Sequence, residues 1–434
     1  MNNRMPKTPW AWVPSLYFAE GLPYVAVMAI TIILYKQLGL SNGEITFYTS
    51  WLYLPWVIKP LWSPFIGLFR TQRWWIAAME LLIGAAFGGV AFTIPTAFWL
   101  QGSLFFFWVM AFSCATHDVA ADQFYLLESN QHHTRLFGIR TAFYRLATIF
   151  GQGLLVMIAG NLQVIYRNSI SFSWSLLFYG VTGLFIVLWL WHSYVLPRPE
   201  KDVPRTGAGV RTLWGELTEN ITSFFRQPQA ASGIMFMLLF CLPLALLSKV
   251  APLFLIDAAH AGGLGLSPQE FGLVQGTVGV VGLTVGSIVG SVSVGRDGLK
   301  RWLWPMVGAV CLPALVYVAL SYALPGSFLL VNLCVFCEQF GCGFGLTAYT
   351  FYLLYYSRGN FRQGHYGLCT ALMSLSMMLP GLLAGWLQEA VGYRVFFIVA
   401  AVCCLFTFGV AALVRVDADF GVKTDDEETE EEGL

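Results

Sequence analysis

Two acidic side chains share one face of a long apolar segment, at a spacing that could support proton transfer. The stretch FSCATHDVAADQFYLLE covers residues 112–128 and contains His117, Asp118 and Asp122. Residues four apart lie on the same face of a helix, so the two carboxylates point the same way. A charge in the lipid core costs about 2.5–3.5 kcal/mol even on lenient scales. The pair therefore needs a water-filled path, a basic partner or a proton, and each of these indicates transport.

Seven more ionisable side chains fall inside apolar segments. They are Glu20, Lys59, Glu80, Arg140, Arg145, Lys249 and Glu338. Glu80 and Arg140 lie nearer the membrane surface, and without them four acids, including Asp118 and Asp122, oppose three bases. A carboxyl group without a basic partner in a low-dielectric environment readily keeps a proton. The excess of acid therefore predicts proton coupling.

The proton-coupling residues we expect are Asp118 and Asp122 first, then Glu20 and Glu338. Like charges four residues apart oppose joint ionisation, which favours Asp118 or Asp122 as the carrier. His117 could assist, because histidine exchanges protons near neutral pH. A histidine that only forms hydrogen bonds in a helix bundle is an equally good interpretation.

The charge partners we expect are Lys59, Arg145 and Lys249. Arg145 falls at a depth comparable to that of Asp122, and Lys249 at a depth comparable to that of Glu338. A simpler interpretation stays open, in which the two acids of the opening stretch only hold basic side chains in place.

Long apolar runs recur from one end of the chain to the other. Of its 434 residues, 57% are hydrophobic and 11% are charged, whereas soluble proteins contain about 25% charged residues. The sequence therefore predicts an all-α polytopic membrane protein with 12 transmembrane helices in two pseudo-symmetric halves of six. The expected spans are residues 12–36, 45–69, 74–94, 98–127, 136–160, 172–196, 230–256, 271–294, 302–324, 328–356, 364–390 and 395–414.

The basic residues predict the orientation of the spans. With the N-terminus in the cytoplasm, seventeen lysines and arginines fall on the cytoplasmic side, and only Lys36, Arg167 and Arg394 fall on the other. Basic residues accumulate on the cytoplasmic side of membrane proteins. We therefore expect both termini in the cytoplasm.

A polar stretch and a charged end divide the chain. We expect an N-terminal half at residues 1–196, a cytoplasmic linker at 197–229, a C-terminal half at 230–415 and an acidic, disordered tail at 416–434. Apolar residues at helical spacing between 213 and 225 predict an amphipathic helix in the linker. The tail has nine acids and one lysine from residue 417 onward, which is typical of solvated segments.

The two expected halves repeat short motifs at a nearly constant offset. LGLSxxE occurs at residues 38–44 and 264–270, FYLL at 124–127 and 351–354, and GxxTA at 138–142 and 367–371. The copies fall at corresponding spans in the same direction, which indicates parallel repeats. Gly345 and Tyr349 match Asp118 and Asp122, so these charges belong to one half only.

Other classes of protein are disfavoured. No Walker A, HExxH or GxSxG motif occurs, and His132 and His133 fall in a loop beyond the span that contains HDVAAD, so we expect no enzyme. Cys334 and Cys337 lack the second ligand pair of a zinc site, and the nine cysteines suit buried positions. We expect no metal, no cofactor and no nucleic-acid partner, because no basic, aromatic-rich surface is apparent.

Three sequence groups carry a resemblance to a known family. They are FAEGLP at residues 18–23, KPLWSP at 59–64 and SxxTHDxxxD at 113–122. Together they resemble the AmpG-type muropeptide permeases of the major facilitator superfamily, to which acetyl-CoA and siderophore permeases are related. The resemblance implies a proton-driven importer of anhydro-muropeptides in the bacterial inner membrane. The positions that it marks are Gly21, Pro23, Lys59, Trp62, Asp118 and Asp122.

In the facilitator fold that this resemblance implies, spans one, four, seven and ten line a central cavity. Glu20, Asp118, Lys249 and Glu338 place a charge on each of these spans. Aromatic residues on nearby spans could stack on sugar rings, although packing or interfacial roles explain them equally well. The expected substrate-binding aromatics are Tyr24, Trp51, Tyr125, Tyr349 and Tyr352.

The chain departs from the family pattern at two places. His117 stands where muropeptide permeases usually have glutamine, which leaves the ligand open. Gly67 in GLFRTQR stands where the first gating loop usually has an acid. The second copy of the gating motif is intact. Its residues are Gly295, Arg296, Asp297, Lys300 and Arg301.

The sequence as a whole predicts a proton-coupled symporter that imports anhydro-muropeptides or a similar bulky polar solute by alternating access. Its expected partners are the lipid bilayer, a small-molecule solute and protons, and we expect a monomer. The alternatives are a siderophore or other small-molecule permease, a drug exporter of the same fold and, from another class, an integral-membrane enzyme.

Overall fold

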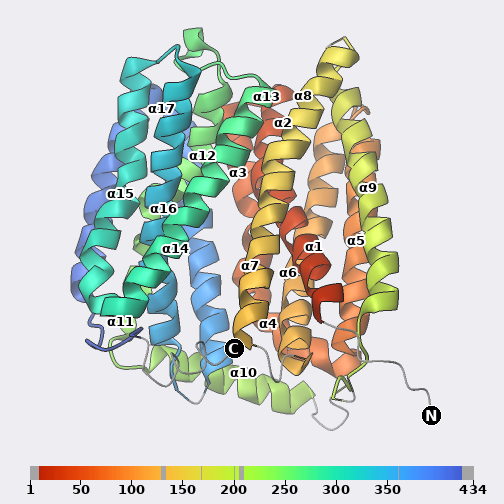
Figure 1. The fold of residues 1–434 in the computed structure, drawn as a ribbon, viewed down its shortest axis with the longest axis vertical. Coiled ribbons are helices and arrows are strands. Elements are labelled where there is room, and N and C mark those ends of the chain that lie inside the picture. Colours follow the sequence, from red (N-terminus) through yellow and green to blue (C-terminus); the bar gives the residue numbers. More distant parts are fainter. Residues whose placement is uncertain are drawn as a thin grey trace. The chain divides into compact units, whose positions relative to one another are not determined.

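The computed structural model describes residues 9–128, 133–167, 169–199, 201–204, 210–359 and 361–422. All regular structure in these ranges is helical (Figure 1). Ten helices of the described residues are long and apolar enough to cross a membrane. The prediction of an all-helical, polytopic membrane protein is thus confirmed.

The chain separates into two units by its internal contacts. Unit 1 comprises Met1–Ser41, Tyr48–Thr218 and Leu266–Thr277, and unit 2 comprises Asn42–Phe47, Glu219–Gly265 and Val278–Leu434. Three elements have residues in both, namely α3 (Asn42–Trp51), α10 (Val210–Phe225) and η5 (Gly272–Gly279). The linker contains α10, which runs crosswise to the long helices of unit 1 (Figure 1).

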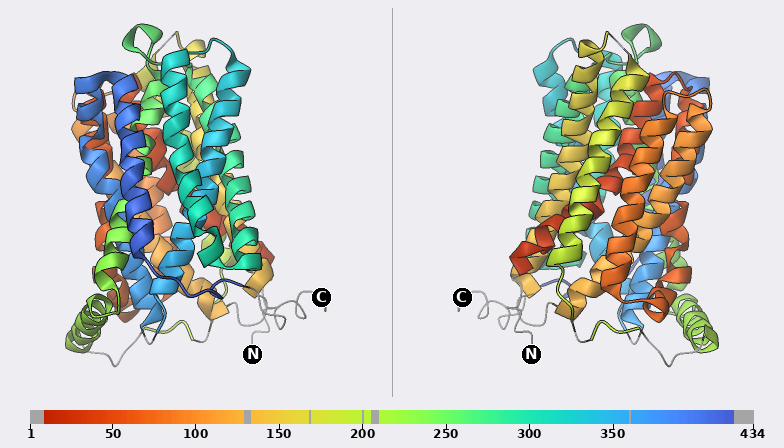
Figure 2. Two further views of the ribbon diagram at one scale, coloured as in Figure 1. Left: turned by 90° about the vertical axis from the view of Figure 1, so that its left-hand side faces the viewer. Right: turned by 90° about the vertical axis from the view of Figure 1, so that its right-hand side faces the viewer.

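Unit 1 is organised around α5, which packs along α6 and along α9 (Figure 2). The helix α1 packs against α7 and α6. The elements of unit 1 are η1 (Pro9–Ala11), α1 (Val13–Val25), η2 (Ala26–Ile30), α2 (Thr31–Gln37), α4 (Leu54–Phe69), α5 (Gln72–Thr93), α6 (Trp99–Glu128), α7 (His133–Thr148), η3 (Ile149–Leu155), α8 (Val156–Ile165), α9 (Ile170–Val195) and α13 (Pro268–Phe271).

Unit 2 is organised around α16, which packs against α14 and α15, while α12 packs against α17. The elements of unit 2 are α11 (Ala230–Leu239), α12 (Leu242–Ile256), η4 (Ala259–Ala261), α14 (Val280–Asp297), α15 (Leu299–Ala323), α16 (Phe328–Tyr356) and α17 (Arg362–Leu413).

Several expected spans differ from single straight helices. The span at residues 45–69 is interrupted, because α3 ends at Trp51 and α4 begins at Leu54. Pro55 occupies the first turn of α4, where its missing N–H costs no helical hydrogen bond. The spans at 364–390 and 395–414 run together in α17, which is interrupted at Gly392, with φ of 76°. Glycine adopts this left-handed conformation without steric cost.

The first span is irregular close to its only acid. It continues from α1 through the π-helical segment η2 into α2. Pro23 lies inside α1 and has no N–H to donate to the carbonyl group four residues earlier. That carbonyl belongs to Ala19, which directly precedes Glu20. The local helix is therefore weakened where the charged side chain enters the bundle.

Two π-helical segments meet in unit 1. Gly153 lies in η3 and Gly276 lies in η5, and a Cβ atom on Gly276 would overlap the backbone nitrogen and Cα of Gly153. Small residues allow membrane helices to approach this closely. Glycine is therefore required at position 276 for backbone-to-backbone contact.

We expect Gly276→Val to lower the free energy of unfolding by about 3 kcal/mol, the upper end of the usual cost of overpacking. The added side chain has no space, because the neighbouring atoms are backbone. Thermal unfolding of the purified protein in detergent measures the change. Gly180→Val is the matched control, since a Cβ atom on Gly180 meets nothing within 4 Å. Equal stability of the two variants would contradict the contact.

Residues 414–422 pack against other parts of unit 2. Val416 is buried, the Phe420 carbonyl accepts a hydrogen bond of 2.9 Å from Leu299 N, and the guanidinium of Arg358 lies 4.1 Å from the centre of the Phe420 ring. The predicted disordered tail is therefore wrong for residues 416–422, because their apolar side chains find a surface to cover. Residues 423–434 lie outside the described residues.

Candidate functional site

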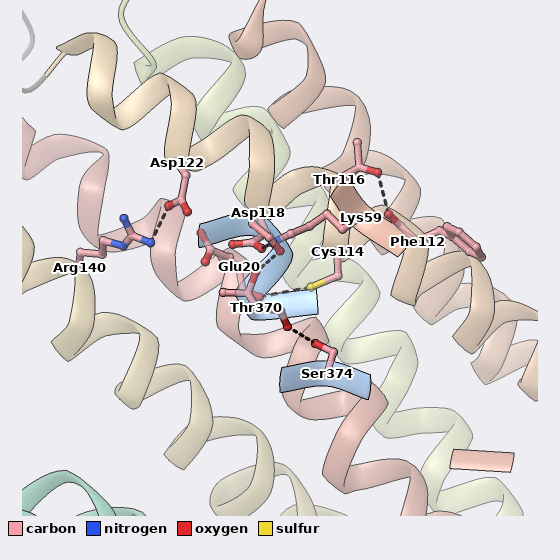
Figure 3. Close-up of polar contacts among 11 residues, drawn as sticks. Glu20, Lys59, Phe112, Cys114, Thr116, Asp118, Asp122, Arg140, Thr370 and Ser374 are labelled. Carbon is pink, nitrogen blue, oxygen red and sulfur yellow. Dashed lines mark hydrogen bonds and ion pairs between the residues drawn. The ribbon is translucent and has the colours of Figure 1, made fainter. Parts of the chain in front are cut away.

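Three carboxyl groups from two helices meet inside unit 1. Oxygen atoms of Glu20, Asp118 and Asp122 all lie within 4.8 Å of one another. Asp118 and Asp122 are one turn apart on α6, and Glu20 reaches them from α1 (Figure 3). Glu20 is 5% exposed, whereas the side chain of Asp122 is 41% exposed. The cluster thus has a buried end and an accessible end.

Close helix packing fixes the position of Glu20. A Cβ atom on the next residue, Gly21, would lie 2.9 Å from Ala147 Cβ and 3.1 Å from the Tyr144 carbonyl oxygen, so α1 approaches α7 closely. On the side of α6, Cys114 Sγ lies 3.7 Å from the backbone carbonyl oxygen of Glu20. A bulkier residue at position 21 would push the acid away from α6.

Two basic side chains pair with this cluster. Lys59 Nζ on α4 lies 2.5 Å from Asp118 Oδ2, and Arg140 Nη2 on α7 lies 2.6 Å from Asp122 Oδ1 (Figure 3). Within the described residues, Glu20 Oε2 is buried and has no hydrogen-bond partner. Three acids opposite two bases leave one negative charge when all are ionised, and one bound proton removes it.

Asp122 pairs with Arg140, whereas the expected partner was Arg145, whose role stays a prediction. The two arginines are five residues apart on α7, and at about 100° per residue they differ by about 140° around the helix. The guanidinium of Arg140 also lies 4.5 Å from the centre of the Tyr17 ring and 5.8 Å from that of Tyr125. The sequence interpretation excluded Arg140 because it lies near the membrane surface. Depth in the membrane does not determine which face of α7 a side chain occupies.

A second buried cluster escaped the sequence interpretation. Glu80 on α5 is fully buried, as are His117 and His192. Glu80 Oε1 lies 2.5 Å from His192 Nδ1 and 3.4 Å from His117 Nε2, and His192 Nε2 lies 2.8 Å from Ser15 Oγ. His117 therefore faces Glu80, while its neighbour Asp118 faces Lys59. The available signal was His192, a lone ionisable residue inside an apolar segment.

The two expected charges of the C-terminal half are both buried. Lys249 is 1% exposed and Glu338 is 5% exposed. The carboxylate oxygens of Glu338 accept hydrogen bonds of 2.9 and 3.1 Å from Gln339 Nε2. The pairing of Lys249 with Glu338 stays a prediction.

The expected substrate-binding aromatics fall into different environments. Tyr24 packs edge-on against Trp56, Trp51 is 36% exposed, and Tyr125 faces Arg140. Those three keep the predicted role as an open proposal.

Tyr349 and Tyr352 are corrected to core residues of unit 2. Tyr349 is fully buried, its hydroxyl donates a hydrogen bond of 2.7 Å to the Met237 carbonyl, and its ring stacks on Phe236 and Phe240. Tyr352 is 2% exposed and packs against Phe236. Neither ring has a free face for a sugar.

In the second half, the positions that correspond to Asp118 and Asp122 have packing roles. A Cβ atom on Gly345, which matches Asp118, would overlap the Val310 side chain, so α16 lies close to α15 there. Tyr349, which matches Asp122, belongs to the core. Ser374, which matches Arg145 in the repeat, donates a hydrogen bond from its Oγ to the Thr370 carbonyl at 3.1 Å (Figure 3).

The gating motif forms a compact turn between α14 and α15. Asp297 accepts hydrogen bonds from Arg301 Nη1 at 2.8 Å and from Trp302 Nε1 at 2.9 Å. Gly298 follows with φ of 79°, a conformation that suits glycine. The motif is thus anchored through its aspartate, while Gly295, Arg296 and Lys300 keep their predicted gating role as a proposal.

The three carboxylates of unit 1 have the chemistry of a hard-cation site, because such cations prefer oxygen ligands. However, an ammonium group already contacts Asp118 and a guanidinium group already contacts Asp122. The arrangement is better suited to exchange of a proton than to a dedicated metal site.

The sequence comparisons match a transporter superfamily and individual transporters. Residues 15–360 match the family model described as Major Facilitator Superfamily. The putative transporter AmpG 4 of Rickettsia conorii is 22% identical over 401 residues, which cover 90% of this chain and 92% of the relative. The anhydromuropeptide permease of Escherichia coli K12 is 23% identical over 402 residues, which cover 88% of this chain and 75% of the relative. The predicted likeness to AmpG-type permeases is confirmed.

Solved transporter structures share the fold. The nucleoside transporter NupG superposes with a TM-score of 0.68 at 15% identity, covering 94% of this chain and 99% of that one. A POT family transporter in complex with a thioalcohol-conjugated peptide superposes with a TM-score of 0.67 at 13% identity, covering 94% and 98%. The family-model match extends over most of the chain and ends beyond α16. This chain is a permease-type transporter, not an enzyme, and it belongs to the Major Facilitator Superfamily.

Proposed function

We propose that the protein is a proton-coupled symporter that imports anhydro-muropeptides, or a similar bulky polar solute, across the bacterial inner membrane by alternating access. The substrate class is supported by the relatives named AmpG and anhydromuropeptide permease. The observation that carries proton coupling is the charge excess in unit 1, where Glu20, Asp118 and Asp122 face Lys59 and Arg140.

The proposal includes twelve spans in two six-helix halves, with both termini in the cytoplasm and a monomeric protein. The proposed count of twelve is supported by ten long helices among the described residues, together with the interrupted α3–α4 segment and the division of α17 into two arms. The halves are residues 1–196 and 230–415, joined by the linker at 197–229. The basic residues support the orientation, since most fall on one side of the spans.

A single proton moves within the carboxylate cluster in this mechanism. Asp122 is the accessible member at 41% exposure, so it exchanges the proton with water, and Glu20 is the buried member at 5% exposure. With the proton bound, acids and bases balance, and the cost of an uncompensated charge in a low-dielectric environment disappears. Proton binding thereby changes the relative free energies of the transport conformations.

The deciding experiment is uptake of radiolabelled anhydro-muropeptide by proteoliposomes, with and without an imposed proton gradient. We expect the unchanged solute to accumulate only with the gradient, and a protonophore to abolish accumulation. Accumulation of a siderophore but not of the muropeptide would overturn the substrate class. Gradient-independent equilibration would overturn coupling, and chemical conversion of the solute would indicate an enzyme.

We expect Asp122→Asn to reduce gradient-driven uptake to the rate seen without a gradient. The amide cannot exchange the proton, whereas it still accepts a hydrogen bond from Arg140 and leaves folding intact. Solute counterflow, which needs no net proton movement, is expected to persist. Glu219→Gln on the exposed surface of α10 is the matched control. Full gradient-driven uptake by Asp122→Asn would contradict the proton role.

A further inference from the structure

An apolar pocket of about 560 Å³ lies between α4, α5 and α6 of unit 1. Seven of its 13 lining residues are tryptophan or phenylalanine. The two hydroxyl groups in the lining are already used, because Ser113 donates to the Val109 carbonyl at 2.7 Å and Thr116 to the Phe112 carbonyl at 2.8 Å. Of the indole groups in the lining, Trp75 Nε1 donates to the Ile66 carbonyl at 2.8 Å, and Trp62 Nε1 is buried without a hydrogen-bond partner among the described residues. The pocket therefore offers few hydrogen-bonding groups to a polar solute.

The rim of this pocket faces outward from unit 1. Phe69 at the end of α4 is 67% exposed, and Phe105 on α6 is 61% exposed. The helix α6 is long and apolar enough to cross a membrane. Large apolar side chains exposed on such helices contact the hydrocarbon of the bilayer. The available occupant at this depth is therefore a lipid chain.

The length of the pocket matches one leaflet. Its lining on α6 runs from Phe105 to Thr116, which at 1.5 Å per residue spans about 16 Å. The hydrocarbon core of a bilayer is about 30 Å thick, so this distance corresponds to the acyl chains of one leaflet. A chain that entered at one end of the pocket could lie along its whole length.

A basic residue lies next to the end of the pocket formed by Phe69. Arg70 directly follows Phe69 and is exposed, and its guanidinium lies 5.8 Å from the centre of the Trp74 ring. Trp74 is 47% exposed, as is typical of tryptophan at a membrane interface. Arg73 differs, because it donates hydrogen bonds to the carbonyls of Ser193 and Leu196. Arg70 is therefore the arginine placed to meet a lipid phosphate.

We propose that this pocket is a lipid-binding site that holds one acyl chain of an anionic phospholipid, with the phosphate at Arg70. Lipid tails are as apolar as the pocket, so selectivity comes from contact with the aromatic lining and from the headgroup charge. Lys59 on α4 and Asp118 on α6 belong to two of the three helices that line the pocket, and their side chains pair at 2.5 Å. A chain seated between α4 and α6 therefore also supports the ion pair of the transport site.

The test uses phosphatidylglycerol with a photoactivatable group on its acyl chain, added to the full-length protein in mixed-lipid vesicles. We expect cross-linked peptides from α4 and α6. Unlabelled phosphatidylglycerol should compete about fivefold better than phosphatidylcholine, the ratio expected for one basic residue at an anionic surface.

Variants that fill the pocket should remove the cross-link. Val109→Trp enters from α6 and Met79→Trp from α5, and the second keeps the test valid if the first fails to fold. The matched control is Val187→Trp on α9, where the side chain is 61% exposed and lines no part of the pocket. Arg70→Gln should abolish the headgroup preference, whereas Arg211→Gln on the exposed surface of α10 should keep it.

Three results would overturn the proposal. Equal labelling of all lipid-facing helices would show that the pocket retains no particular chain. Labelling that survives both filling variants would place the lipid elsewhere. Equal competition by phosphatidylglycerol and phosphatidylcholine would exclude a role for Arg70 and a preference for an anionic lipid. None of these results depends on the transported solute.

Discussion

Replacing Lys59 with alanine is expected to abolish gradient-driven uptake and to destabilise the protein by about 3 kcal/mol, the lower end of the cost of breaking a buried ion pair. The lower end applies because the side chains of Lys59 and Asp118 are 18% and 21% exposed. Without the ammonium group, Asp118 lies near Glu20 and Asp122 with Arg140 as the only base of the cluster described above. Transport assays in proteoliposomes and thermal unfolding in detergent measure both effects.

The double variant Lys59→Ala, Asp118→Ala separates charge balance from transport. Removal of both partners leaves Glu20 and Asp122 opposite Arg140, the same excess of one acid as in the wild type. We therefore expect stability to recover while uptake does not. Lys201→Ala, at an exposed position of the linker, is the control for loss of a lysine. Wild-type uptake by Lys59→Ala would exclude the ion pair from the transport cycle.

The second large effect is expected at Glu80. Glu80→Ala removes the shared carboxylate between His117 and His192 and leaves two fully buried imidazole rings without it. We expect a loss of about 3–5 kcal/mol in the free energy of unfolding, measured by chemical or thermal unfolding. Glu216→Ala, exposed on α10, is the matched control.

His117→Gln tests whether this cluster is structural. The glutamine amide can still donate a hydrogen bond to Glu80, and AmpG-type permeases usually have glutamine at this position. We therefore expect nearly unchanged stability and uptake. Loss of gradient-driven uptake in a stable His117→Gln variant would show instead that the imidazole takes part in proton transfer.

The fold was largely predictable because hydrocarbon forces the backbone to satisfy its own hydrogen bonds, and long apolar runs can do so only as helices. The irregularities were harder to place. Proline at position 55 indicates a break, but the end of α3 at Trp51 depends on packing. The interruption at Gly392 inside α17 depends on one dihedral angle, which no hydropathy pattern records.

The site was predictable only where its members are close in sequence. The four-residue spacing of Asp118 and Asp122 fixes their common face, so their proximity follows from helix geometry alone. The rotation of α7 brings Arg140 to Asp122, and that rotation is set by close approaches such as that of Gly21 to Ala147. Glu80 and His192 are distant in sequence, so their contact required the packing of α5 on α9.

The contact between Leu299 and Phe420 has a consequence for synthesis of the protein. The turn that bears the gating motif is complete in sequence once α15 has begun, yet the hydrogen-bond acceptor of Leu299 N is the Phe420 carbonyl. Both arms of α17 must therefore leave the ribosome before this hydrogen bond can form. Until then, the turn between α14 and α15 relies on the contacts of Asp297 with Arg301 and Trp302, and its hydrogen bond to Phe420 forms only late in synthesis.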